Sequence, residues 1–280
     1  MHIKPLKYSV EQSDPPLDRR DTLPTMYDLP SENQEEPGLP DEFHYRQPPL
    51  LSLTFHPGNY PPEEIFSAGD MNLYYDVRHH SWYKRPDWFG VVGVSRLYEQ
   101  RDLRLSYVMW QELVAPTVVV ELLSPGTESE DLGKSNRLSS QPPTKWEVYE
   151  QILKVPYYIV FNRYTDELKA FMLTGGFYRE MKLTSPKIWI PQLELGLGLW
   201  LGDYEGLHRK WLRWYDGDGN WILTPTERSA VAQQQLLVAQ EEREAERQRA
   251  EAERQRAEAE RQRAQRLEEL LRSRGIDPDS

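Results

Sequence analysis

The chain has 280 residues, a net charge of −11, and a hydrophobic content of 38%. This length allows one medium-sized domain with an appendage, and the acidic balance argues against a general polyanion-binding surface, so any basic patch is expected to be local. The absence of cysteine excludes disulfides and thiolate metal sites. No run of about 18 apolar residues occurs, so we expect no membrane span, and the lack of cysteine fits the expected cytoplasmic location.

Composition divides the chain into four segments. Residues 1–50 are rich in Pro, Asp and Glu with little periodicity, which predicts an extended arm that is partly ordered against the body. Residues 51–226 carry nearly all the Trp and Tyr and are expected to form the folded domain. Residues 227–274 are expected to form a charged helix or a weak coiled coil, and residues 275–280 a tail.

The domain is predicted to contain strands, a central helix and two hairpins. Apolar or alternating runs predict strands at 71–76, 88–94, 105–110, 117–123 and 157–161. Helical spacing predicts a helix over 145–153, with Thr144 as N-cap and Glu147 completing a capping box. Hairpins are expected around Gly175-Gly176 and between 212–215 and 221–223. This order indicates an α/β or α+β fold.

Near the C-terminus, one heptad, Glu-Ala-Glu-Arg-Gln-Arg-Ala, occurs three times without change from Glu244 to Ala264. Glu and Arg are spaced three or four residues apart, as neighbours on a helix surface are, and each such pair stabilises a helix by about 0.2–0.5 kcal/mol. The seam of a coiled coil would alternate Ala with Gln, without large side chains. A lone charged helix and a weak coiled coil therefore both remain open.

Two acidic residues stand out because each adjoins an apolar, β-branched run. Asp87 follows Pro86 at the start of one predicted buried strand, and Glu121 follows Val118-Val119-Val120 at the end of another. A buried carboxylate is costly unless it is paired or binds a metal. Two of them on neighbouring strands predict a site for a hard cation, typical of a metal-dependent hydrolase. The alternatives are a turn or cap role for Asp87 and a solvent-exposed strand end for Glu121.

Several blocks of sequence resemble the Uma-two family when taken in order. They are Pro86-Asp87 with its apolar run, the segment from Val119 to Thr127, then Asp131, Lys145 with Tyr149, and 155–158. The resemblance covers roughly residues 60 to 185, and its most specific part is Glu-Leu-Leu-Ser-Pro-Gly-Thr. That family is similar to restriction endonucleases of the PD-(D/E)XK superfamily.

The resemblance implies a restriction-endonuclease-like mixed central sheet flanked by helices, to which the composition of 227–274 adds a long charged helix at the C-terminal end. It also implies that Asp87 and Glu121 bind Mg²⁺ or Mn²⁺, which prefer oxygen ligands. Such an ion would polarise a phosphate and activate a water molecule. The expected reaction is hydrolysis of phosphodiester bonds in DNA.

The resemblance further implies a catalytic lysine that stabilises charge on the phosphate. In the superfamily this lysine stands two residues after the glutamate, where this chain has Leu123. In the family it comes from the next helix, four residues before a tyrosine, and Lys145 and Tyr149 match that spacing. Lys134 is the competing candidate, because it lies nearer Asp131 in the sequence, and 133–144 reads as an insertion relative to the family pattern.

Other residues have weaker claims to function. Asp131 is expected to support the site or to lie in a loop, and Asp70 and Asp76 are candidate third carboxylates or surface residues. The pair His79-His80 is a weak metal candidate. Residues 216–220 mimic the start of an EF-hand loop, but position six, where a glycine is required, is Trp221, so a hairpin turn is expected. The aromatic residues Trp200, Trp211, Trp214 and Trp221 suit core packing or base stacking.

Three functional classes therefore stay open. The first is a Mg²⁺-dependent endonuclease; the second is a catalytically inactive nuclease-fold adaptor that binds a protein partner through its C-terminal helix; the third is a hydrolase of another phosphoester. The broken Glu-x-Lys motif favours the adaptor, and the retained carboxylates favour an enzyme. A homodimer is also compatible with the sequence.

Overall fold

The computed structural model describes residues 41–124, 128–134 and 142–274. The chain forms two compact units, residues 1–222 and residues 223–280, and each is treated by itself. Parts of the predicted arm, the Pro125-Gly126-Thr127 segment, most of the predicted insertion and the C-terminal tail lie outside the described residues.

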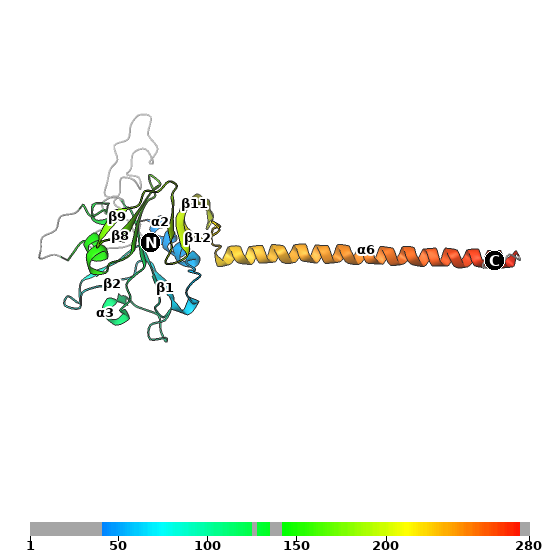
Figure 1. Ribbon diagram of the computed structural model, residues 1–280, viewed down its shortest axis with the longest axis horizontal. Coiled ribbons are helices and arrows are strands. Elements are labelled where there is room, and N and C mark those ends of the chain that lie inside the picture. Colours follow the sequence, from blue (N-terminus) through cyan, green and yellow to red (C-terminus); the bar gives the residue numbers. More distant parts are fainter. Residues whose placement is uncertain (1–40, 125–127, 135–141, 275–280) are drawn as a thin grey trace, which may run out of the picture. The chain divides into compact units, whose positions relative to one another are not determined.

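Short helices and a larger number of strands make up the first unit, and one long helix makes up the second (Figure 1). The elements, in chain order, are α2 (Glu42–Thr54), η1 (Pro62–Glu64), β1 (Ile65–Ala68), β2 (Leu73–Tyr74), β3 (Tyr83–Lys84), β4 (Trp88–Val92), β5 (Tyr107–Val108), α3 (Met109–Glu112), β6 (Val118–Leu122), α4 (Glu128–Asp131), α5 (Lys145–Glu147), the π-helical turn η2 (Val148–Ile152), β7 (Tyr157–Asn162), β8 (Glu167–Thr174), β9 (Phe177–Glu180), β10 (Lys187–Ile190), β11 (Leu195–Tyr204), β12 (Leu207–Tyr215) and α6 (Pro225–Ser273).

The central sheet has six strands in the order β1-β4-β6-β7-β8-β9. The β6–β7 pair is parallel, whereas the β4–β6 and β7–β8 pairs are antiparallel. The parallel pair is joined by a crossover that contains α5 and η2, as parallel strands require. The predicted mixed α+β fold, with a long C-terminal helix, is confirmed.

Strand β6 is buried along its whole length, which explains its unbroken apolar sequence. Because side chains alternate between the faces of a sheet, Val118, Val120 and Leu122 enter one core cluster. Val119 and Leu123 enter the other cluster, so Glu121 points to that second face.

The first face of the central sheet packs against helix α2 and the sheet β10-β11-β12. Gln47 of α2 joins the two, because its side-chain amide donates to the Leu212 carbonyl and accepts from the Leu212 N–H, both at 2.8 Å. Because β12 is an edge strand, the Leu212 N–H and carbonyl would lack partners on its open side. The two hydrogen bonds from Gln47 satisfy both groups. The side chain of Gln47 is fully buried.

Helix α2 corrects the prediction of an extended arm for its residues 42–50. The segment is a helix capped by Asp41, whose side chain accepts from His44 N, and its Phe43, Leu50 and Leu51 are core residues. Two internal prolines, Pro48 and Pro49, normally break helices because they lack an N–H donor. Burial of the apolar side chains against β12 outweighs that cost here, and sequence periodicity alone does not reveal it.

The second face of the central sheet is covered by α5, η2 and the small sheet β3-β2-β5. The strands predicted at 71–76 and 105–110 are only two residues long, and the second ends where α3 begins at Met109. The helix predicted from Lys145 is present, although its second half is a π-helical turn. Thr144 and Glu147 form the predicted capping box.

The first predicted hairpin is β8–β9, whose turn residues Gly175 and Gly176 both have positive φ, at 64° and 86°. The second unit is helix α6, which begins with another capping box between Thr224 and Glu227. Among the described residues, no helix has the length and apolar character needed to cross a bilayer.

Candidate active site

Asp87 and Glu121 lie side by side on the second face of the central sheet. Trp88 pairs with Val120 in the antiparallel β4–β6 ladder. Asp87, just before β4, therefore lies opposite Glu121 of β6. The Asp87 N–H donates to Glu121 Oε2 at 3.3 Å, and the Leu122 N–H donates to Asp87 Oδ2 at 2.6 Å. The local β-ladder alone therefore brings the two predicted carboxylates together.

Helix α5 and the turn η2 supply two donors to Glu121, whose side chain is fully buried. Lys145 Nζ lies 3.0 Å from Glu121 Oε2, and the Tyr149 hydroxyl donates to Glu121 Oε1 at 2.8 Å. The four-residue spacing puts both side chains on one helical face. The capping box at Thr144 fixes the start of that helix and hence the position of Lys145.

Asp131 completes the ionic cluster, although it lies outside the two strands. Its Oδ1 is 3.1 Å from Lys145 Nζ, and its side chain is 1% exposed. This oxygen has no partner that satisfies hydrogen-bond geometry among the described residues. Asp131 is thus a buried ion-pair partner of Lys145 at the end of α4, and a supporting role in the site stays a prediction.

The cluster has more negative than positive charge. If Asp87, Glu121 and Asp131 are all ionised, Lys145 leaves two negative charges in excess. Burial raises the pKa of Glu121 well above its ordinary value, and the neighbouring carboxylates add to this, although Lys145 opposes it. Burial likewise raises the pKa of Asp87. Burial lowers the pKa of Lys145, but the carboxylates outweigh it and hold that pKa well above its ordinary value.

The donor chemistry of the cluster fits a hard divalent cation. All the acidic donors are carboxylate oxygens, which suit Mg²⁺ and Mn²⁺, and a dication would balance the excess negative charge. Within the part of the chain that the structure describes, no three His, Cys, Asp or Glu side chains are arranged to hold a metal together. The two carboxylates of Asp87 and Glu121 suit Mg²⁺ better than a metal whose ligands are all protein side chains. Mg²⁺ commonly binds through one or two carboxylates plus water and phosphate oxygens.

Helix α2 contributes a histidine that sequence reasoning missed. His44 Nε2 lies 2.9 Å from the Leu122 carbonyl, and His44 Nδ1 lies 2.9 Å from Asp41 Oδ1. The other oxygen of Asp41 is 2.6 Å from Arg163 Nη2. The series of contacts Arg163–Asp41–His44 therefore ends at the Leu122 carbonyl of β6, next to Glu121.

The pKa shifts of His44 and Asp41 follow from these contacts. Burial lowers the pKa of His44, but the Asp41 hydrogen bond and the nearby Asp87 carboxylate outweigh it, so the net shift is upward. Burial raises the pKa of Asp41, but the His44 hydrogen bonds outweigh it and lower the pKa below its ordinary range. The protonated form of His44 is therefore favoured beside Asp41 relative to a histidine in water. Its only sequence signal was the N-cap spacing from Asp41 to His44.

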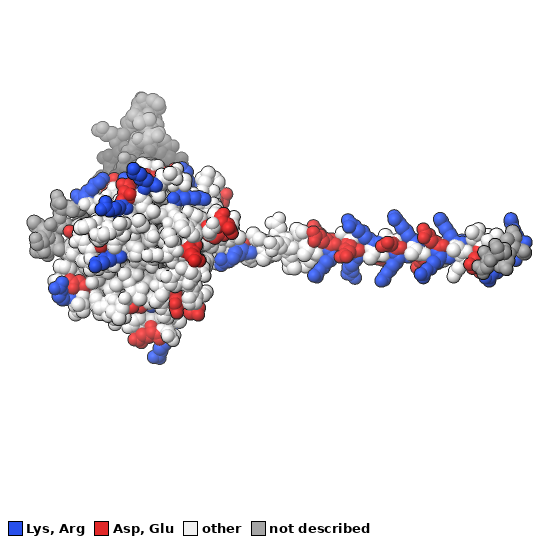
Figure 2. Space-filling view, viewed as in Figure 1, with Lys and Arg blue, Asp and Glu red and all other residues white. Residues whose placement is uncertain are grey.

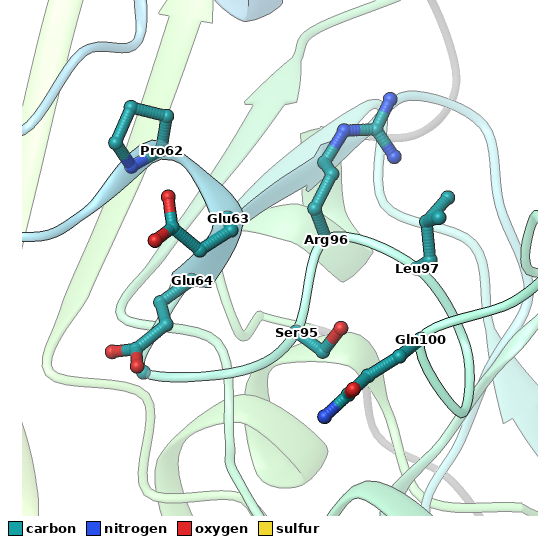
Figure 3. A pocket seen from close by; sticks show the side chains of 8 residues that line it. Pro62, Glu63, Glu64, Ser95, Arg96, Leu97 and Gln100 are labelled. Carbon is teal, nitrogen blue, oxygen red and sulfur yellow. The ribbon is translucent and has the colours of Figure 1, made fainter.

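Two surface cavities differ in their relation to the cluster. One, of about 380 Å³, is lined by His44 and Tyr45 of α2 and by Gly69 and Asp70 after β1. The Asp70 N–H donates to the Asp87 carbonyl at 3.3 Å, so this cavity adjoins the cluster. The other, of about 870 Å³, is lined by residues around Glu63 and Arg96 and by none of the predicted site residues (Figure 3). Of these two cavities, only the smaller has a lining residue that is hydrogen-bonded to Asp87, and neither is lined by Asp87, Glu121 or Lys145.

The competing candidates do not join the cluster. Lys134 is exposed, whereas Lys145 contacts both Glu121 and Asp131. Asp70 pairs with Arg85 at 3.6 Å, and Asp76 accepts from His79 at 2.7 Å. Assignment of a catalytic role to Lys145 stays a prediction, but its position is the one that the family spacing implied.

The weaker motifs have structural roles. His79 stacks on Trp82 with ring centroids 3.9 Å apart. Asp216 accepts from the Asp218 and Asn220 N–H groups, which makes the predicted turn. Trp211 and Trp214 are fully buried core residues, as the packing alternative predicted.

Comparison with protein-family models identifies a family for this chain. The profile of the Uma2 family, described as "Putative restriction endonuclease", matches residues 21–205, which include Asp87, Glu121, Asp131 and Lys145. No curated protein matches the chain. The family match covers well over half of the chain, and it includes the strand pair and the helix that build the acidic cluster. The chain therefore belongs to the Uma2 family, whose members are described as restriction-endonuclease-like.

Proposed function

We propose that the first unit is a divalent-metal-dependent endonuclease that hydrolyses phosphodiester bonds in DNA. Membership of a restriction-endonuclease-like family supports a nuclease-type function. The observation that carries the metal-dependent form is the buried cluster in which Glu121 and Asp131 both pair with the single ammonium group of Lys145, with Asp87 beside Glu121. A dication would balance this excess of negative charge, and the bound ion would in turn attract a phosphate oxygen.

Each residue then has a distinct role. Asp87 and Glu121 would hold Mg²⁺ or Mn²⁺, which supplies Lewis acidity and a more acidic bound water. Lys145 would stabilise the charge that develops on the phosphate. Asp131 would position the Lys145 ammonium, and the Tyr149 hydroxyl and the Leu122 N–H would hold the two carboxylates in place.

The test is cleavage of supercoiled and single-stranded DNA with Mg²⁺ or Mn²⁺. Wild type is expected to nick DNA only with metal, and Glu121→Gln and Lys145→Met are each expected to lose about 10²-fold or more of that rate. Lys134→Met is the matched control, since Lys134 is exposed and outside the cluster. Equal loss in Lys134→Met and Lys145→Met would contradict the assignment of the lysine.

A specific observation favours the adaptor alternative. Both oxygens of Glu121 already have donors, from Lys145 and Tyr149, so the site is partly satisfied without a metal. Leu123 stands where the superfamily lysine would be and is buried in the core. The two functions differ in metal binding. A nuclease requires Mg²⁺ or Mn²⁺ to raise the melting temperature of wild type but not of Asp87→Asn, whereas an adaptor needs no such difference.

A further inference from the structure

Helix α6 is long and charged, and it has no packing partner among the described residues of its own unit. It spans Pro225–Ser273, 49 residues, and none of them is buried. Figure 2 shows acidic and basic side chains alternating along it. Helices in water normally gain most of their stability by packing one face against something. One face of the repeated heptad from Glu244 to Ala264 is therefore expected to meet a partner.

Only one choice of seam keeps charge off the contact positions of a coiled coil within the repeat. The core positions a and d are three residues apart, so the seven-residue repeat allows seven possible seams. Six of them place a Glu or an Arg at a or d. The remaining one places Ala245 and its repeats at a, and Gln248 and its repeats at d.

The same seam continues towards the start of the helix. Counting back in sevens through the a positions of the repeat gives Val238 and then Val231, with Gln234 and Glu241 at d. These valines are 48% and 43% exposed, although valine is apolar. The a position is therefore apolar in five consecutive heptads, as a core position of a coiled coil requires. Further on, Arg266 occupies a and the pattern ends.

The charges beside this seam specify an orientation. Throughout the repeat, position g is Glu, as at Glu244, and position e is Arg, as at Arg249. In a parallel pair, g of one helix faces e of its partner, so Glu meets Arg in every repeat. In an antiparallel pair, g faces g and e faces e, so Glu would meet Glu and Arg would meet Arg. Like charges opposed in this way act against the wrong arrangement.

We propose that α6 binds α6 of a second copy of this chain as a parallel two-stranded coiled coil, with Ala and Gln at the seam and Glu–Arg pairs on both sides. The occupant is a second copy because the heptad is complementary to itself in the parallel orientation. The small seam residues make the pairing depend on the charges, so it is sensitive to salt. This inference uses α6 alone and is independent of the proposed nuclease activity.

The first test is the mass of the full chain in solution by sedimentation equilibrium. Wild type is expected to approach twice 33.0 kDa at micromolar concentration and low salt, and to dissociate towards monomer at about 1 M salt, where the screening length is about 3 Å. A wild type that stays monomeric at low salt, or a pair unaffected by salt, would overturn the proposal.

Charge-swapped variants test the pairing itself. An acidic variant carries Arg249→Glu, Arg256→Glu and Arg263→Glu, and a basic variant carries Glu244→Arg, Glu251→Arg and Glu258→Arg. Each variant alone is expected to be monomeric, with helix content checked by circular dichroism, and their mixture is expected to form a 1:1 pair. Dimers of either variant alone would refute the role of the charges.

A single introduced cysteine tests the orientation. The natural chain has no cysteine, so Gln262→Cys provides one unique thiol at a d position. A parallel, in-register pair places the two thiols together, and oxidation is expected to cross-link most of the protein. In an antiparallel pair a d position faces an a position, so the introduced thiol would lie opposite an alanine such as Ala245 of the second copy, with no cross-link. A dimer that does not cross-link would therefore overturn the parallel arrangement.

Discussion

Replacing Lys145 by methionine tests the charge balance of the acidic cluster. Lys145→Met keeps the aliphatic length but removes the cation that pairs with Glu121 at 3.0 Å and Asp131 at 3.1 Å, both of which are essentially buried. Breaking a buried ion pair by removing one partner costs about 3–5 kcal/mol, because it leaves an uncompensated charge. We expect the unfolding free energy to fall by that amount at about pH 8.

The loss of unfolding free energy in Lys145→Met is expected to be smaller at acidic pH, because proton binding is linked to folding. Burial raises the pKa of Glu121, and removing Lys145 removes the largest effect that lowers it. The folded variant then binds more protons than the unfolded chain between the ordinary value of 4.5 and the raised pKa. Stability therefore falls as pH rises through that window and is recovered as pH falls. The difference from wild type should shrink at about pH 5.

The assay is urea denaturation followed by tryptophan fluorescence at both pH values. All nine Trp lie in the first unit, so the signal does not include α6. The matched control is Lys169→Met, since Lys169 pairs with the half-exposed Glu167 at 3.3 Å and is expected to contribute less than about 1 kcal/mol. If Lys145→Met costs no more than Lys169→Met at about pH 8, the reasoning about the buried cluster is wrong.

Further substitutions test other contacts of the same unit. Tyr149→Phe removes the hydroxyl that donates to Glu121 at 2.8 Å and should lower the unfolding free energy by about 1.5–3 kcal/mol in urea denaturation. Gln47→Leu leaves the N–H and the carbonyl of Leu212 without their acceptor and donor, and about 1–3 kcal/mol should be lost for each group, measured by the same method. Because the pKa of His44 is raised in the folded chain, its stabilising effect should be complete below about pH 6.5 and disappear as pH rises through the folded pKa. Unfolding curves of wild type and His44→Gln across that range should therefore converge at alkaline pH, and a constant difference would contradict the role of a charged His44.

Local sequence was sufficient for the strands that carry the two carboxylates. The apolar runs beside Asp87 and Glu121 predict buried strands. Because side chains alternate along a strand, the period of two decides to which face of the sheet each carboxylate points. The helix at Lys145 was likewise predicted from its capping box, which depends only on residues three positions apart. The heptad of α6 is also purely local, because one repeat contains all its charges and its seam.

Tertiary structure decided the features that depend on residues far apart in the chain. Helix α2 contradicts its local proline signal because burial of its apolar face against β12 stabilises it. His44 contacts Leu122 across 78 residues, and no local pattern encodes that approach. The approach of Asp131 to Lys145 similarly requires the crossover to fold over the sheet. Spacing and periodicity report only on neighbours within a few turns, whereas these contacts exist because separate elements share one buried core.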